Sequence, residues 1–373
     1  MQYFIINLEY ILYKFEENLT NLEFAGKITM KVIEMKDRKE LVRQYILNLI
    51  AKNHTQIVAK TLETFGDEIS KSTVYNYLNE LCANGIIEKK DNKYSLKKQG
   101  FRFRYKNDGS LDEDRVFDND IAPIIINDKD NVKRACRYAF TEMMNNAIEH
   151  SASEEIFVIV EITAVYIDMY VNDFGVGIFN NIREFIKREK GKELTLKECA
   201  SLLFAGKFTT AKSRHSGEGI FFTSHLMDSF LILSEGVLFS RNNFKDMNFD
   251  FKIDRDKGTA VLMRLARDTK KTTIDVFSRF SNVEEGFVKT QIPIAHVFSG
   301  FGPVSRSEAR RLSELISSFK QVELDFSGVE EVGQAFVHEL FGVWQKNNPN
   351  IEITITNANS DVDFMIRRVR AQL

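Results

Sequence analysis

The segment Asn172-Asp-Phe-Gly-Val-Gly177 decides how the centre of the chain is interpreted. Two alternating runs rich in β-branched residues, 155–163 and 164–171, lead into it and predict consecutive strands. An aspartate at a strand end can accept a hydrogen bond from an amino group, and the two glycines let a flat ligand approach the backbone. Segments of this kind are also common in ordinary turns, so the interpretation depends on what surrounds it.

A long helical pattern over 131–150 precedes these strands. Glu142, Asn146 and His150 recur every four residues, so they lie along one face of the predicted helix. The amide oxygen of Asn146 is a hard ligand suited to Mg²⁺, and the Glu142 carboxylate can hold or deprotonate a nucleophile. A polar network in the core would use a Glu–Asn pair in the same way, and this alternative stays open.

Two further segments follow along the chain. The first is a loop rich in Gly, Ser, Thr and Lys that ends in Ser216-Gly-Glu-Gly-Ile220 and opens an apolar helix. Backbone amides at a helix start favour phosphate, and Lys212 adds positive charge. Residues 206–219 form a loop that is long enough to act as a lid. The second is Gly258-Thr-Ala260 at the start of a strand, where the Thr259 hydroxyl can meet a base through water.

Taken in order, these segments resemble the sequence boxes of the GHKL superfamily of gyrase-type ATPases, MutL and histidine kinases. The resemblance covers residues 120–268 and implies a Bergerat-type α/β sandwich with ATP and Mg²⁺ as cofactors. It also implies that Asn146 holds Mg²⁺, that Asp173 binds adenine and that the glycine loop wraps the phosphates. The nucleotide-binding residues implied are Asn146, Asp173, Gly175, Gly177, Lys212, Gly217, Gly219 and Thr259, with Glu142 as the catalytic candidate.

The placement of Glu142 four residues before Asn146 looks most like the anti-sigma-factor serine kinases, and it also matches the catalytic glutamate of gyrase-type hydrolases. Histidine kinases usually carry a phospho-accepting helix just upstream, whereas a different pattern stands there in this chain. Three functions follow as alternatives: a regulator that binds ATP as a switch, a protein serine/threonine kinase, and an ATP-hydrolysing clamp.

Residues 35–98 predict three helices and a hairpin, with Asp91-Asn92 as a two-residue turn. This order, with Thr73-Val-Tyr-Asn-Tyr-Leu in the third helix, resembles the winged helix-turn-helix of bacterial regulators. DNA is therefore an expected partner, and a protein-contact module with solvated lysines is the alternative. The DNA-binding candidates are Lys71, Ser72, Thr73, Tyr75 and Asn76 in the helix and Lys89, Lys90 and Lys93 in the hairpin.

Strand and helix patterns alternate through residues 274–373, which predicts a small α/β domain. Leu324-Asp-Phe-Ser-Gly-Val329, followed by Gly333-Gln-Ala-Phe336, resembles a STAS-like domain of unknown function that is often fused to such ATPases. STAS antagonists carry a phosphorylated serine at the turn 332–336, where this chain has no hydroxyl, so phosphorylation there is not expected. A protein partner and a structural or dimerising cap are the two interpretations of this region.

Composition sets the remaining bounds. The chain has 373 residues, 43% of them hydrophobic, and a net charge of −2, which fits two or three globular domains and limits any nucleic-acid surface to a local patch. Three scattered cysteines and the absence of a long apolar run favour a cytoplasmic protein without a membrane partner. The predicted class is a multi-domain α+β protein in which 1–34 is an extension of unknown role and 99–119 a connector, with a homodimer as one assembly to test.

Overall fold

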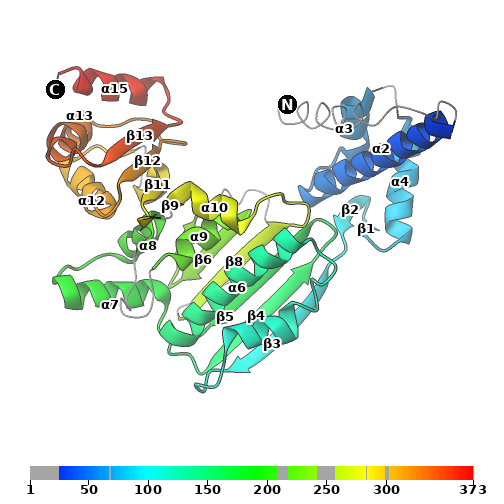
Figure 1. Ribbon diagram of the computed structural model, residues 1–373, viewed down its shortest axis with the longest axis horizontal. Coiled ribbons are helices and arrows are strands. Elements are labelled where there is room, and N and C mark those ends of the chain that lie inside the picture. The colour runs from blue at the N-terminus through cyan, green and yellow to red at the C-terminus, as the bar shows by residue number, and fades with distance from the viewer. Residues whose placement is uncertain are drawn as a thin grey trace. The chain divides into compact units, whose positions relative to one another are not determined.

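The computed structural model describes residues 25–66, 69–207, 217–241, 257–282, 284–298 and 302–372, the first thirteen of them as backbone only. The chain divides into two compact units, with the boundary between Lys97 and Lys98, and each is described by itself (Figure 1). Within these ranges, every helix is too short or too polar to cross a membrane.

The first unit contains three helices and a hairpin in the predicted order. These elements are α2 (Ala25–Ala51), α3 (Ile57–Phe65), α4 (Lys71–Ala83), β1 (Ile87–Lys90) and β2 (Lys93–Leu96). Positive φ at both Asp91 and Asn92 forms the two-residue turn expected from the sequence. Helix α2 begins inside the predicted extension 1–34, of which residues 1–24 lie outside the described part of the chain.

A six-stranded antiparallel sheet forms the centre of the second unit, in the order β3-β4-β5-β8-β6-β7. Helix α6 (Asp130–His150) lies along one face of this sheet, as Figure 1 shows. The buried residues Ala135, Ala139, Met143 and Ala147 recur every four positions on the helix side that packs inward. The strands are β3 (Gln99–Lys106), β4 (Glu155–Ile162), β5 (Tyr166–Asp173), β6 (Ser229–Ser234), β7 (Val237–Ser240) and β8 (Thr259–Ala266).

The prediction of a connector over 99–119 is wrong in the first half of that region. Residues Gln99 to Lys106 form strand β3, which pairs with β4 along its whole length. The strand alternates partly buried Phe101, Phe103 and Tyr105 with exposed neighbours, a period of two that indicates a strand at a sheet edge. Helix α5 (Glu113–Val116) and the π-helical turn η2 (Phe117–Ile121) complete the segment.

Three more helices border the sheet: α7 (Ile178–Lys190), α8 (Leu196–Ala205) and α9 (Gly219–Leu226). The sequence predicts only the last of these. Helix α8 starts with a capping box in which Thr195 accepts from the Glu198 amide while the Glu198 carboxylate bonds back to Thr195.

The C-terminal layer is built on a three-stranded parallel sheet in the order β11-β12-β13. One strand, and not two, forms in 288–297, because Pro293 ends β11 and the turn of helix α11 follows. The helix predicted over 335–344 is α-helical only in its first turn and π-helical afterwards. The helices and strands of the C-terminal layer are α10 (Thr273–Phe280), β9 (Ser281–Asn282), β10 (Gly286–Phe287), β11 (Lys289–Pro293), α11 (Ile294–Val297), α12 (Arg306–Ile316), β12 (Gln321–Asp325), α13 (Gln334–Val337), η3 (His338–Trp344), α14 (Gln345–Asn347), β13 (Glu352–Thr356) and α15 (Ser360–Arg370).

The two layers of the second unit share part of a hydrophobic core. Ala205 at the end of α8, and Phe221 and Phe222 in α9, belong to the same buried cluster as the residues of the parallel sheet. The ring of Phe222 stacks on Phe277 of α10, with centroids 4.1 Å apart. The helices on either side of the loop 206–219 are therefore packed into the C-terminal layer, and the predicted boundary near 268–274 is not where the two buried clusters of this unit divide.

Candidate functional site

A cavity of about 270 Å³ opens where the four sequence segments meet. Helix α6, the end of β5, the start of α9 and the start of β8 each provide part of its wall. Of the predicted residues, it is lined by Glu142, Asn146, Asp173, Gly177, Gly217, Gly219 and Thr259. Lys212, and the greater part of the predicted lid 206–219, lie outside the described residues.

Asp173 lines the cavity and is only 4% exposed. Its Oδ1 accepts hydrogen bonds from the backbone amides of Gly175 (3.0 Å) and Thr259 (3.2 Å), which fixes the orientation of the carboxylate. The Thr259 hydroxyl in turn accepts from the Ile178 amide (3.1 Å). Apolar side chains of Val171, Ile232 and Val261 line the cavity as well, so a buried acceptor stands beside an apolar wall.

Gly175 is not among the lining residues, and its contacts give it another role. A Cβ atom added to Gly175 would lie 1.7 Å from the carbonyl oxygen of Ser151, which also accepts a hydrogen bond from the Val176 amide (2.7 Å). The glycine thus lets the turn after β5 lie against the end of α6. Gly175 therefore serves the packing of the turn, and its predicted contact with a ligand stays a prediction.

Glu142 lines the cavity next to the start of α9. A Cβ atom added to Gly219 would lie 2.0 Å from Glu142 Oε2, so the carboxylate is in contact with the second glycine of that loop. Glu218 and Asn146 line the same cavity. Burial raises the pKa of Tyr138, and the negative charges of Glu142 and Glu218 raise it further. Carboxylate and amide oxygens together suit a hydrated divalent cation.

Sequence reasoning missed several lining residues, of which Asn181 is the most informative. Its side-chain amide donates to the His150 carbonyl oxygen (3.3 Å), which ties α7 to the end of α6. The amphipathic spacing of Phe179, Ile182 and Ile186 was the available signal for this helix. Asn145 and Ser151 also line the cavity and were not singled out.

The candidate DNA residues belong to the first unit and lie mainly at its surface. All are exposed except Thr73, which is partly buried. The hydroxyls of Ser72 and Thr73 lie 2.7 and 2.8 Å from the Ser70 hydroxyl, which caps α4 by accepting from the Thr73 amide. Lys89 lies over the ring of Tyr94. Two of the predicted contacts therefore take part in the helix cap, whereas the lysines of the hairpin extend from the surface.

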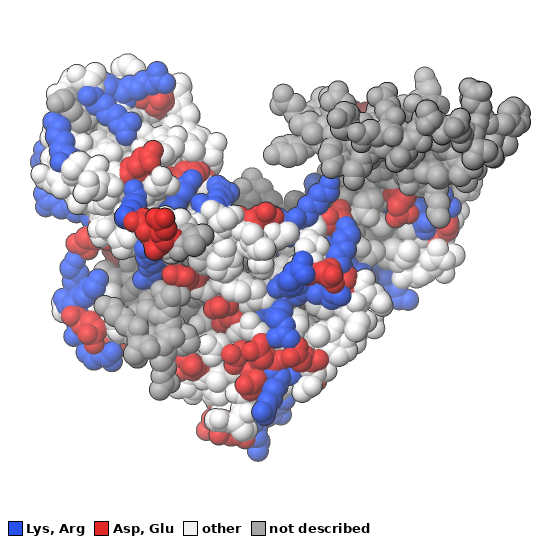
Figure 2. Space-filling view, in the orientation of Figure 1, with Lys and Arg blue, Asp and Glu red and all other residues white. Residues whose placement is uncertain are grey.

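Charge on the visible face of the second unit is mixed. Figure 2 shows Lys and Arg next to Asp and Glu over the sheet and its helices. Arg104 pairs with Glu155 (2.6 Å), and Arg137 pairs with Asp114 (2.7 Å). Attraction of a polyanion is not expected from this face, because opposite charges stand side by side there.

Substitution of Gly175 by alanine tests the packing of the turn. We expect Gly175→Ala to lower the free energy of unfolding of the second unit by about 3 kcal/mol, because the methyl group meets backbone that cannot move aside. Gly100→Ala, where nothing lies within 4 Å of the added carbon, is the matched control and should change it by less than about 0.5 kcal/mol. Equal melting of the two variants in denaturant would contradict the assignment.

Comparison with known proteins adds one match. Residues 308–363 match the family model of a STAS-like domain of unknown function (DUF4325). Among curated proteins no match is found. The matched span runs from α12 to α15 and includes the strands β12 and β13. The C-terminal layer of this mixed α/β protein is therefore STAS-like, as the motif around Asp325 predicts.

Proposed function

We propose that this protein is an ATP- and Mg²⁺-binding regulator of the GHKL type, which couples the state of its nucleotide to binding of DNA or of a partner protein. The observation that carries the proposal is the convergence of four separate segments on one cavity. Each segment contributes the group that its sequence suggests: an acceptor, a cation ligand, a glycine loop and a hydroxyl. Convergence of unrelated turns on one cavity would not match chemistry to position in this way.

The proposed nucleotide pose follows the polarity of the cavity. The adenine lies at the end lined by Asp173 and Val261, where a buried carboxylate accepts from the amino group and the wall is apolar. The phosphates lie toward Gly217 and Gly219, at the start of α9, where backbone amides favour anions. Asn146 provides an oxygen ligand for Mg²⁺, which otherwise keeps water and phosphate oxygens.

Coupling to the STAS-like part is supported by contacts at the end of α8. The Thr290 hydroxyl of β11 donates to the Ala205 carbonyl oxygen (2.7 Å), and both groups are buried. The buried guanidinium of Arg241 donates to the carbonyl oxygens of Phe204 (2.7 Å) and Gln291 (3.0 Å). A displacement of the end of α8 would therefore move the parallel sheet, because these buried hydrogen bonds connect the two directly.

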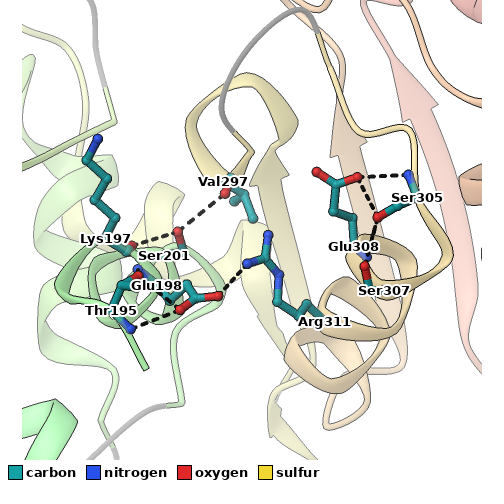
Figure 3. A network of polar contacts seen from close by, with 9 residues as sticks. All are labelled: Thr195, Lys197, Glu198, Ser201, Val297, Ser305, Ser307, Glu308 and Arg311. Carbon is teal, nitrogen blue, oxygen red and sulfur yellow. Dashed lines mark hydrogen bonds and ion pairs between the residues drawn. The ribbon is translucent and has the colours of Figure 1, made fainter. Parts of the chain in front are cut away.

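A second set of contacts joins α8 to α11 and α12 (Figure 3). Arg311 of α12 donates to Glu198, the third residue of α8 and part of its capping box, and the Ser201 hydroxyl lies 3.5 Å from the Val297 carbonyl oxygen. The Arg311–Glu198 pair is largely exposed, so it contributes at most about 1 kcal/mol to stability. Its value to the proposal is geometric, because it links the cap of α8 directly to the region that matches the STAS-like family.

The output of the proposed switch is assigned to the first unit and to the STAS-like part. In the first unit, the order of three helices and a hairpin with exposed lysines supports a winged helix that contacts DNA in the cytoplasm. A kinase of the anti-sigma-factor type is the second candidate, favoured by the position of Glu142 against Gly219 in the cavity. Product analysis separates the two functions.

The proposal is tested by titrating the full chain with ATP, with and without Mg²⁺, followed by identification of the products. We expect saturable binding that strengthens with Mg²⁺, and loss of most of that Mg²⁺ dependence in Asn146→Ala. Label in a protein band would favour the kinase, and free phosphate would favour hydrolysis. The absence of Mg²⁺-dependent ATP binding would overturn the proposal.

A further inference from the structure

The turn between β6 and β7 has a backbone conformation that its sequence disfavours. Glu235 and Gly236 form the two-residue loop of this hairpin, with φ of +45° and +70°. Loops of this type need positive φ at both positions, which glycine, asparagine and aspartate adopt most readily. A glutamate in this conformation is strained, and such strain persists where the surrounding structure fixes it, often at functional sites.

The carboxylate of Glu235 is bound on both sides. Its Oε1 accepts a hydrogen bond from the Asn180 side-chain amide (3.1 Å), in the first turn of α7. Its Oε2 accepts from the Ser234 hydroxyl (2.7 Å), which also lies 2.8 Å from the carbonyl oxygen of Gly258, just before β8. The Glu235 side chain therefore bonds directly to the start of α7. Its Oε2 competes with the Gly258 carbonyl oxygen for the one proton of the Ser234 hydroxyl, next to the Thr259 amide that donates to Asp173.

Gly177 shows how closely the carboxylate approaches the cavity wall. This glycine lines the cavity and has a φ of +78°. A Cβ atom added to it would lie 1.4 Å from Glu235 Oε1, so the carboxylate rests directly on the backbone of the turn. Burial raises the pKa of Glu235, and the charge of Asp173 raises it too, although the bonds from Ser234 and Asn180 act in the opposite direction. The two carboxylates are thus close enough for their charges to interact.

We propose that Glu235 is a positioning residue, which holds the turn from Asp173 to Gly177 in the conformation that receives the base of the nucleotide. The inference rests on the proposed function, since it assumes that the cavity binds ATP. It adds a residue from outside the four segments, and it gives Gly177 a second role as the place where that residue packs.

The variant Glu235→Gly separates positioning from simple stabilisation. Glycine relieves the strain of the positive φ, which offsets the lost bonds to Asn180 and Ser234, so we expect the melting temperature of the second unit to change little. We also expect the Kd for Mg·ATP, measured by calorimetry on the full chain, to rise about tenfold, because without the bonds of Glu235 only about a tenth of the molecules would hold the turn in the binding conformation. A side chain with only a structural role would give the opposite combination: a lower melting temperature and an unchanged Kd.

Ala152→Gly is the matched control, because Ala152 is exposed and has a positive φ of 54°. It should keep or raise the melting temperature without changing the Kd. Glu235→Gln, which keeps the volume and one acceptor, should raise the Kd about threefold and supports the inference even if the glycine variant does not fold. If Asp173→Asn abolishes ATP binding while both Glu235 variants bind as the unaltered chain does, the positioning role is wrong. If the unaltered chain does not bind ATP, the proposed function fails first.

Discussion

Asp173→Asn is expected to lower the affinity for ATP at least a hundredfold, or about 3 kcal/mol. In the structure Oδ1 accepts from two backbone amides, those of Gly175 and Thr259. An asparagine would turn its single oxygen toward these donors, and its NH₂ group would replace the second carboxylate oxygen. The adenine amino group would then meet a donor and not an acceptor, which costs far more than the loss of one bond in an open site.

The measurement is equilibrium binding of ATP to the full chain, with a thermal melt to show that the variant is folded. Asp325→Asn is the matched control. Asp325 also ends a strand and accepts from the backbone amide two residues later, at Ser327 (2.9 Å), but it lies in the STAS-like part. Its substitution should leave the affinity for ATP within about twofold of the original value. Retention of tight binding in Asp173→Asn would refute the assigned base site.

A chain ended after Asp268 is expected to lose cooperative folding and ATP binding together. The truncation removes the residues that cover Ala205, Phe221 and Phe222, whose exposed fraction is 1% or less in the complete unit. Exposing two phenylalanines and an alanine at a helix pair beside the cavity removes several kcal/mol of burial and leaves an apolar patch. A fragment 98–373 should fold and bind ATP like the full chain.

A single substitution tests the same core without truncation. Phe222→Ala should lower the free energy of unfolding of residues 98–373 by about 3–5 kcal/mol, because the ring is buried and stacked on Phe277. Phe364→Ala, at a ring that is 63% exposed, should change it by less than about 0.5 kcal/mol. Two separate unfolding transitions for residues 98–373, with only one of them sensitive to Phe222→Ala, would contradict a shared core.

The cavity was the part of the molecule most accessible from sequence. Glycines with a fixed spacing after a strand, and a Glu–Asn pair one helical turn apart, are short-range patterns, so they can be interpreted without knowledge of the tertiary structure. Gly175 shows the limit of this approach: a glycine of the motif was assigned to the ligand, whereas its contact with Ser151 serves the backbone. Sequence alone does not distinguish the two reasons for lacking a side chain.

Tertiary contacts explain the other differences. Strand β3 lies at a sheet edge and is only partly buried, so polar and basic residues make up much of it and the segment resembles a connector in spite of its alternating aromatic residues. The shared core could not be predicted because Phe221 and Phe222 are typical of the apolar face of any helix. Which surface covers such a face depends on residues far along the chain, here those of the parallel sheet.

The role proposed for Glu235 could not be predicted from sequence either, because it depends on a contact with Gly177, which stands 58 positions earlier in the chain.

The shared core also bears on how the parts of this protein could be exchanged with others. Recombination that replaces the STAS-like segment alone would place a foreign surface over Ala205, Phe221 and Phe222. A hybrid protein would therefore have to inherit α8 and α9 together with the parallel sheet, and so would inherit the glycines at the start of α9 that line the cavity. Exchange at the boundary seen in the sequence would divide one folded unit, while exchange at Lys98 would preserve it.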